Sequence, residues 1–226
     1  MINEIINADC IEFMKQYKNG GGTVNITLTD IPFGVVNKKS NGLRVIDKGD
    51  ADNINFELDE FLNLVYEITT GTVIIFCAKE QLSQIYKFFA AKQGTTRQLI
   101  WQKSNPSPMN GEYVYLSGIE NAVWYKKRGG VFNARCKNTV FKFPNGRSKL
   151  HPTEKNHDLI RELILDNSNV GDIVFDPCCG SGTHCLVAAE ENRKYIGVEI
   201  QKKYYDIATK RLNDFNKQRW YNGERN

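Results

Sequence analysis

The amino-acid sequence predicts an α/β fold in which helices cover both faces of a mainly parallel sheet. Short apolar segments typical of strands alternate along the chain with segments whose apolar residues recur every three or four positions, as in amphipathic helices. This alternation favours parallel strands connected by helices. The length of 226 residues suits one sizeable α/β domain and is short for two.

The first half of the chain opens with a short strand and then alternates strands with helices. Val24 to Thr29 alternates apolar and polar residues, as a strand does. Leu58, Phe61, Leu62 and Val65 follow helical spacing. The predicted elements are a strand at 4–7, a strand at 24–29, a helix at 56–69, a strand at 72–77 and a helix at 81–93.

The second half continues this alternation. Its predicted elements are strands at 98–103 and 121–125, a helix at 153–166, a strand at 172–176, a helix at 183–192, a strand at 195–200 and a helix at 202–217. Two stretches lack any such pattern: 34–55 is polar, and 129–150 is more basic and more aromatic. Long irregular stretches in a compact domain are usually functional or disordered.

The composition narrows the class of protein. It is 41% hydrophobic and 25% charged, and no apolar run approaches the roughly 20 residues of a membrane helix. The N-terminus lacks a basic region followed by an apolar core, so we expect no signal peptide and a cytoplasmic protein. The six cysteines have no zinc-type spacing, which predicts free thiols and no metal site. A net charge of +4 permits a nucleic-acid partner without requiring one.

The segment 174–183 carries the strongest local signal, because a strand runs into a Gly-x-Gly turn and then a helix. Ligands of parallel sheets bind beyond the carboxyl ends of the strands, where Asp176 stands. The helix N-terminus favours an anion, and Glu199 at the next strand end can accept hydrogen bonds from two ribose hydroxyls. S-adenosylmethionine fits this pattern. A dinucleotide is a second candidate, although Cys185 stands where its third glycine is expected, and a plain tight turn is a third.

A second motif, Asp30-Ile31-Pro32-Phe33, ends the strand at 24–29. Alone, it is also compatible with an ordinary turn capped by an aspartate. It resembles the (Asp/Asn/Ser)-Pro-Pro-(Tyr/Phe/Trp) signature of the amino-methylating DNA methyltransferases, from which it departs at Ile31. The order of the two motifs resembles the β group of that family, in which the catalytic motif precedes the cofactor motif.

Other segments resemble this family in the same order. Residues 6–12 are similar to the segment whose acidic residue lies by the cofactor adenine, and 100–106 and 120–125 are similar to the middle motifs. His-Pro-Thr-Glu-Lys at 151–155 resembles the HPTxKP element, with Asn156 in place of the final proline. His151 at its start is a candidate general base, but we favour a structural role for it.

This resemblance implies a fold and an activity. The fold is the Rossmann-like seven-stranded methyltransferase fold, as a single domain over 1–226, and the cofactor is S-adenosyl-L-methionine. Family members with Asp at the first catalytic position mostly methylate N6 of adenine, whereas those with Ser mostly methylate N4 of cytosine. Asp30 therefore implies adenine in DNA. The alternatives are N4-cytosine methylation of DNA and adenine methylation of RNA.

The resemblance also assigns the site. The Asp30 carboxylate and the Ile31 carbonyl would hold the two amino hydrogens, Pro32 would fix the turn, and Phe33 would stack on a flipped base. The residues implied at the cofactor are Asp9, Cys10, Thr153, Lys155, Asp176, Pro177, Cys178, Gly180, Ser181, Gly182, Thr183 and Glu199.

Double-stranded DNA is the implied partner. The loop at about 34–55 would be a mobile lid over the flipped base, and about 126–150 would be a short target-recognition insertion. So short a region predicts a short target, weak specificity, or help from the second subunit of a homodimer. The basic residues expected to contact DNA are Lys38, Lys39, Arg44, Lys126, Lys127, Arg128, Arg135, Lys137 and Arg147.

Overall fold

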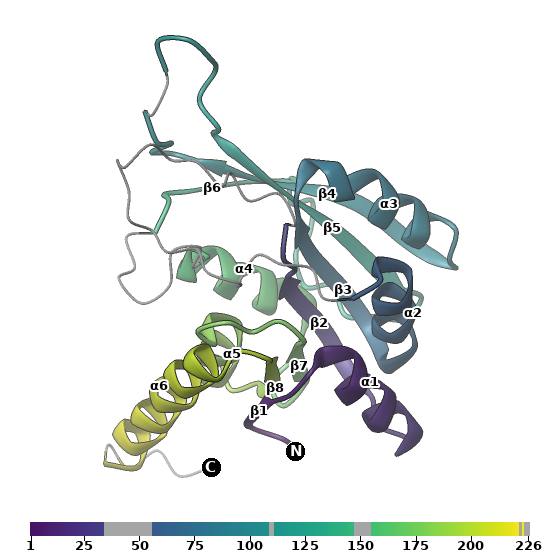
Figure 1. The fold of residues 1–226 in the computed structure, drawn as a ribbon, viewed down its shortest axis with the longest axis vertical. Coiled ribbons are helices and arrows are strands. Elements are labelled where there is room, and N and C mark those ends of the chain that lie inside the picture. The colour runs from purple at the N-terminus through teal and green to yellow at the C-terminus, as the bar shows by residue number, and fades with distance from the viewer. Residues whose placement is uncertain (34–55, 109–110, 147–154, 222, 224–226) are drawn as a thin grey trace.

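The computed structural model describes residues 1–33, 56–108, 111–146, 155–221 and 223. Its centre is an eight-stranded sheet with the strand order β1-β8-β7-β2-β3-β5-β4-β6 (Figure 1). The strands are β1 Glu4–Asn7, β2 Val24–Asp30, β3 Thr69–Cys77, β4 Gly94–Lys103, β5 Ile119–Lys127, β6 Val140–Phe143, β7 Ile173–Asp176 and β8 Lys194–Glu199. Among them only β5 runs opposite to the rest, so the predicted mainly parallel sheet is confirmed.

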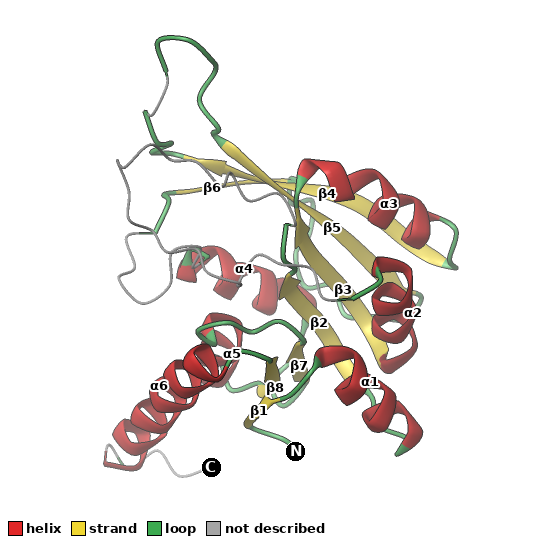
Figure 2. Ribbon diagram, in the orientation of Figure 1, coloured by secondary structure: helices red, strands yellow, loops and turns green. Residues whose placement is uncertain are grey.

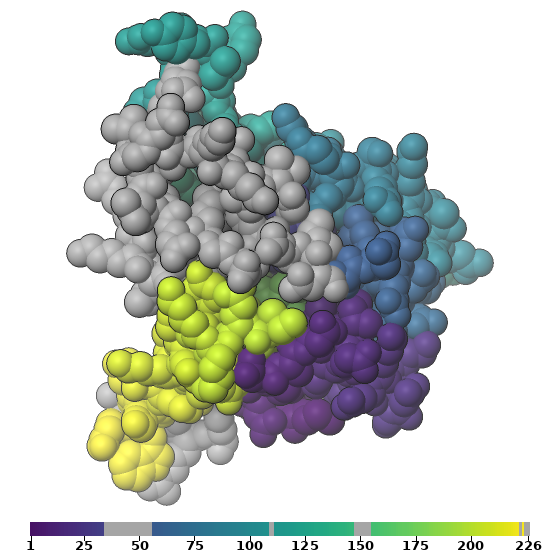
Figure 3. All heavy atoms as spheres, viewed as in Figure 1, coloured from purple at the N-terminus to yellow at the C-terminus, as the bar shows by residue number. Residues whose placement is uncertain are grey.

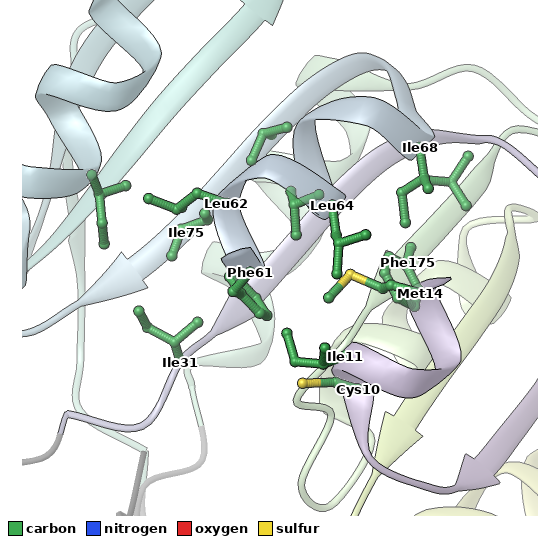
Figure 4. Close-up of a cluster of buried hydrophobic side chains, with 14 of the residues drawn as sticks. Cys10, Ile11, Met14, Ile31, Phe61, Leu62, Leu64, Ile68, Ile75 and Phe175 are labelled. Atoms are coloured by element: carbon green, nitrogen blue, oxygen red, sulfur yellow. The ribbon is translucent and has the colours of Figure 1, made fainter. Parts of the chain in front are cut away.

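The helices form two groups, one on each face of the sheet (Figure 2). They are α1 Cys10–Asn19, α2 Leu58–Ile68, α3 Lys79–Ala90, α4 His157–Asn167, α5 Thr183–Glu190 and α6 Lys202–Tyr221. The apolar faces of α1, α2 and α3 pack on one side of the strands, where Phe61, Leu62 and Met14 are fully buried (Figure 4). α4, α5 and α6 bury Leu163, Val187 and Leu212 on the other side. Both layers remove apolar surface from water, which stabilises the α/β sandwich.

The two ends of the described chain lie on the same side of the molecule. β1 pairs with β8 in parallel, and α6 contacts β1. In the space-filling view the yellow C-terminal helix lies on the same side as the purple N-terminal elements (Figure 3). In the described part of the chain, no helix is both long and apolar enough to cross a membrane.

Two elements and several bounds differ from the sequence prediction. β4 begins at Gly94 instead of 98, and α6 ends at Tyr221 instead of 217. The helix α1 was not predicted, and β6 lies within 129–150, which we expected to be irregular, so the sheet has eight strands and not seven. β6 forms because it pairs in parallel with β4 along Ile100 to Lys103. The helix predicted over 153–166 begins at His157. The predicted lid at 34–55 lies outside the described residues.

Candidate active site

The carboxyl ends of the parallel strands bring the acidic residues of the two sequence motifs together at one edge of the sheet. Asp30 ends β2, Asp176 ends the neighbouring strand β7, and Glu199 ends β8 beside it. Because β5 is antiparallel, its first residues lie at this same edge: Asn121 pairs with Cys77, the last residue of β3. A fourth acidic residue, Glu120, therefore joins them.

The two carboxylate oxygens of Asp30 have different partners. Its Oδ2 lies 2.7 Å from the Nζ of Lys155. Its Oδ1 is buried, and no described residue donates a hydrogen bond to it. Burial raises the pKa of Asp30 to about 6; the Lys155 ammonium opposes this rise and the Glu120 carboxylate adds to it. A buried acceptor without a partner costs stability in the free protein and is therefore suited to a ligand that donates to it.

Lys155 connects two carboxylates. Its Nζ lies 2.7 Å from Asp30 Oδ2 and 2.8 Å from Glu120 Oε2, and its side chain is 5% exposed. The contact with Glu120 Oε2 is an ion pair at close distance, although it lacks the angles of a hydrogen bond. Burial lowers the pKa of Lys155, but the two carboxylates outweigh it and hold that pKa above its ordinary value. The family resemblance assigned Lys155 to the cofactor. The described ion pairs of its ammonium are with Asp30 and Glu120, and none is with the turn at 176–183.

Glu120 has a second cationic partner. The Nζ of Lys103 lies 2.7 Å from Glu120 Oε1. Burial raises the pKa of Glu120, but Lys155 and Lys103 together bring it below its ordinary value. The positions of Lys103 and Glu120 beside Lys155 and Asp30 were not predicted from the sequence, although both residues lie in motif-like segments. The available signal was a charged residue at one end of each of two strands, since Lys103 ends β4 and Glu120 lies near the start of β5.

The segment after Asp30 is anchored in the core. The side chain of Ile31 is 1% exposed and belongs to the same buried cluster as Phe61 and Leu62 (Figure 4). Gln81, in the first turn of α3, donates from Nε2 to the Pro32 carbonyl at 3.0 Å. Ile31, which stands where the family signature has proline, thus fixes the loop through its side chain.

Phe33 is the last residue of the Asp30-to-Phe33 motif. Its ring centroid lies 5.4 Å from the Nζ of Lys155, so Phe33 and Asp30 lie beside the same ammonium. Three of the four motif residues thus have fixed positions through Lys155 or the core, and Gln81 fixes the carbonyl of the fourth.

The Gly-x-Gly turn is held by carboxylates at its base. Glu199 accepts from the N–H groups of Gly180 at 2.9 Å and Gln201 at 2.7 Å, and burial raises its pKa. Asp176 is almost fully buried, with Oδ1 accepting from the Cys178 N–H and Oδ2 lying 2.7 Å from His184 Nδ1. Pro177, which follows Asp176, is buried as well.

Gly182 and α6 fix the other side of the turn. Gly182 caps α5 with a φ of 79°, a left-handed conformation, and a Cβ there would lie 2.9 Å from that of Ala208. Arg211 of α6 donates to the Ser181 carbonyl at 2.8 Å and lies 3.2 Å from Thr183 Oγ1. The turn is therefore preformed around the N-terminus of α5.

These residues fit S-adenosylmethionine. The N-terminus of α5 presents backbone N–H groups, which suit the carboxylate of an amino acid. The Glu199 carboxylate accepts two hydrogen bonds from the backbone and keeps acceptor capacity for ribose hydroxyls, since an ionised carboxylate has about four lone-pair sites.

Asp9 lies close to this turn, because the Ala8 N–H donates to the Glu199 carbonyl at 3.2 Å. Its carboxylate caps α1 by accepting from the Ile11 and Glu12 N–H groups. It also lines an open cavity of about 750 Å³ with Ile11, Glu12 and Phe56 among its other walls. Cys10, the next residue, is buried.

The basic residues predicted to contact DNA are scattered. Lys126, Lys127 and Arg128 end or follow β5, at the amino edge of the sheet and opposite Asp30. Lys126 and Lys127 donate to backbone carbonyls there. Lys137 forms ion pairs with Glu162 at 2.7 Å and Asp166 at 2.5 Å, and Arg135 is exposed nearby. Lys38, Lys39, Arg44, Arg147, His151 and Thr153 lie outside the described residues.

The chain is similar to known DNA methyltransferases in sequence and in fold. A model of the DNA methylase family matches residues 24–210. The chain is 27% identical to the type II methyltransferase M.HinfI of Haemophilus influenzae, over 94% of this chain and 69% of that protein. A crystal structure of the M1.HpyAVI complex with SAM is 29% identical, with a TM-score of 0.75, over 93% of this chain and 99% of the other.

A more distant structure shares the fold alone. The cytosine-N4-specific PvuII DNA methyltransferase is 17% identical, with a TM-score of 0.68, over 98% of this chain and 93% of the other. The fold is therefore shared with a methyltransferase that is specific for N4 of cytosine. The chain belongs to the DNA methylase family, whose members use S-adenosylmethionine to methylate N6 of adenine or N4 of cytosine.

Proposed function

We propose that this DNA methyltransferase transfers its methyl group to N6 of adenine in double-stranded DNA. The observation that carries the proposal is the Asp30 carboxylate at the end of β2, with its buried Oδ1 free of any described hydrogen-bond donor. An exocyclic amino group is a hydrogen-bond donor that would satisfy this acceptor. The choice of adenine rests on the presence of Asp, and not Ser, at the first position of the motif.

The proposed chemistry follows from the poor nucleophilicity of an aromatic amine, whose lone pair is delocalised into the ring. Asp30 Oδ1 and the Ile31 carbonyl would accept the two amino hydrogens and free the lone pair for attack. Phe33 would stack on the base after it leaves the duplex. S-adenosylmethionine, when bound, supplies a methyl group that its sulfonium makes electrophilic.

The identity of the product tests the base. Purified protein is incubated with labelled S-adenosylmethionine and, in parallel, with duplex DNA and structured RNA, and the products are digested to nucleosides and separated. We expect N6-methyladenine from DNA. N4-methylcytosine would refute the choice of base, and label confined to RNA would refute the choice of nucleic acid.

Replacing Asp30 with alanine tests its role. We expect Asp30→Ala to lower the single-turnover rate by at least about 100-fold, the lower end of what a positioned proton acceptor contributes. The affinity for S-adenosylmethionine, measured by calorimetry, should stay within about twofold because Asp30 is outside the Gly-x-Gly turn. Asp206→Ala, an exposed change on α6, is the control. Substantial residual activity in Asp30→Ala would remove Asp30 from the reaction.

A further inference from the structure

Four charged side chains alternate in sign at the carboxyl edge of the sheet. The series runs Asp30, Lys155, Glu120, Lys103, with successive nitrogen–oxygen distances of 2.7, 2.8 and 2.7 Å. It connects β2, the segment before α4, β5 and β4. Lys155 is 5% exposed, Lys103 14%, and the two carboxylates 20% each. Desolvating four charges is costly, so the series requires an explanation.

Glu120 gives Lys155 a second fixed partner. A lysine has a flexible stem, and one exposed ion pair holds it weakly. Two carboxylates on one buried ammonium define its position, and Lys103 fixes the far oxygen of Glu120. As a result the Lys155 ammonium occupies Oδ2 of Asp30, and Oδ1 is left without a described partner.

We propose that Glu120, held by Lys103, is a positioning residue that keeps the Lys155 ammonium on Oδ2 of Asp30, so that Oδ1 alone is presented to the target amino group. Oδ1 then serves both as hydrogen-bond acceptor and as the acceptor of the proton released in methyl transfer. This inference rests on the catalytic role proposed above for Asp30.

Glu120 also has a role at the moment when the proton is transferred. The amino nitrogen forms a bond to the methyl carbon while the carbon–sulfur bond breaks and its electron pair stays on sulfur. The nitrogen, now positively charged, loses one proton to Asp30 Oδ1. Asp30 becomes neutral at that moment, and Glu120 remains as the counterion of buried Lys155. Without Glu120, the same step would leave a buried ammonium unpaired, which is strongly unfavourable.

The fall in rate at low pH tests this arrangement, because the rate falls as Asp30 becomes protonated. Asp30 is faced by Lys155, by Glu120 on β5, by His184 on α5 and by Cys77 on β3. Glu120→Gln removes a negative charge near Asp30 and leaves Asp30 as the carboxylate paired with Lys155. Both effects lower the pKa of Asp30, so the midpoint of the pH–rate profile should move to lower pH. Lys103→Met removes a positive charge that partly neutralises Glu120. The Glu120 carboxylate then repels that of Asp30 more strongly, so the pKa of Asp30 rises and the midpoint should move to higher pH.

The experiment measures single-turnover methyl transfer to duplex DNA at saturating S-adenosylmethionine, from about pH 5 to about pH 8. The wild-type rate should fall below a midpoint near pH 6, the pKa of Asp30. Glu120→Gln should lower the midpoint by about one pH unit and the rate at about pH 8 by about tenfold. Glu190→Gln is the matched control, since Glu190 contacts Arg161 and His157 away from Asp30, and should change neither.

Three results would overturn the proposal: midpoints that do not move, midpoints that move in the same direction in Glu120→Gln and Lys103→Met, or a wild-type rate that is flat with pH. A purely structural role would lower the rate at every pH without moving the midpoint. Thermal melting verifies that each variant is folded, and if Glu120→Gln does not fold, the sign of the Lys103→Met shift decides.

Lys155→Met separates two roles of the lysine. We expect a lower rate with the affinity for S-adenosylmethionine within about twofold; a weakened affinity at an unchanged rate would make Lys155 a cofactor ligand and refute the proposal. Full activity of Asp30→Ala would refute the catalytic role proposed for Asp30, on which this inference rests, whereas the identity of the methylated base tests the proposed function. An inactive Asp30→Ala together with an unmoved Glu120→Gln midpoint would refute only the role of Glu120.

Discussion

At the scale of single residues, Gly182 shows how closely the Gly-x-Gly turn is packed. Its φ of 79° costs an L-residue about 1–2 kcal/mol, and a Cβ would lie 2.9 Å from Ala208 Cβ. We expect Gly182→Ala to lower the free energy of unfolding by about 2–4 kcal/mol and to weaken cofactor binding, because α6 must move.

Gly171 offers a matched control for this change. It has a similar φ of 85°, but a Cβ there has no atom within 4 Å. Gly171→Ala should therefore show the conformational cost alone, about 1–2 kcal/mol, and normal cofactor affinity. Urea denaturation and calorimetry measure both quantities. Equal losses in the two variants would show that contact with Ala208 is unimportant.

Single residues also show where sequence reasoning ends. Asp30, Phe33 and the Gly-x-Gly turn were predictable because each motif is contiguous and has its own chemical logic. Lys103 and Glu120 were not, because their partners lie on other elements and no local pattern connects them. For Lys155 the sequence indicated a functional position, but its ion pairs with Asp30 and Glu120 required the fold.

At the scale of elements, α1 tests whether Asp9 is a helix cap, a cofactor residue or both. Its Oδ1 accepts from the N–H groups of Ile11 and Glu12 at 2.8 and 3.1 Å. Asp9→Ala should lower the free energy of unfolding by about 1 kcal/mol, whereas Asp9→Asn keeps the cap and should be nearly neutral. If the negative charge also serves the cofactor, both variants should bind it more weakly in calorimetry. Normal affinity in Asp9→Asn would leave Asp9 as a cap only.

There are physical reasons why α1, β6 and the start of α4 were not predicted from the sequence. α1 carries a clear N-cap, but it buries only Cys10, Ile11, Phe13 and Met14 near its start, so its apolar stripe is short. β6 has four residues and depends on pairing with β4, a long-range contact. α4 starts late because Asn156 has an extended backbone and accepts from the Leu159 N–H, which places the cap after the HPTxKP-like segment.

At the scale of the whole molecule, the doubly wound sheet gives the protein two different edges. The carboxyl edge carries Asp30, Asp176 and Glu199. The amino edge carries the end of β5, with Lys127 followed by Arg128. A duplex whose base reaches Asp30 must lie over the carboxyl edge. The sequence supplied the basic residues and the alternation of elements, but only the register of β5 against β3 shows which edge each residue occupies.

Lys142 and Arg128 can be used to test which edge of the sheet contacts the duplex. Both side chains are exposed, and both lie about 20 Å from Asp30, Lys142 four strands along the carboxyl edge and Arg128 across the sheet. Each phosphate contact contributes about 0.9 to the slope of log affinity against log salt. We expect Lys142→Gln to reduce this slope by about that amount and to weaken duplex binding at low salt, while Arg128→Gln changes neither. Fluorescence anisotropy across a salt series measures the slope; a reduced slope in Arg128→Gln alone would place the duplex on the amino edge, away from Asp30.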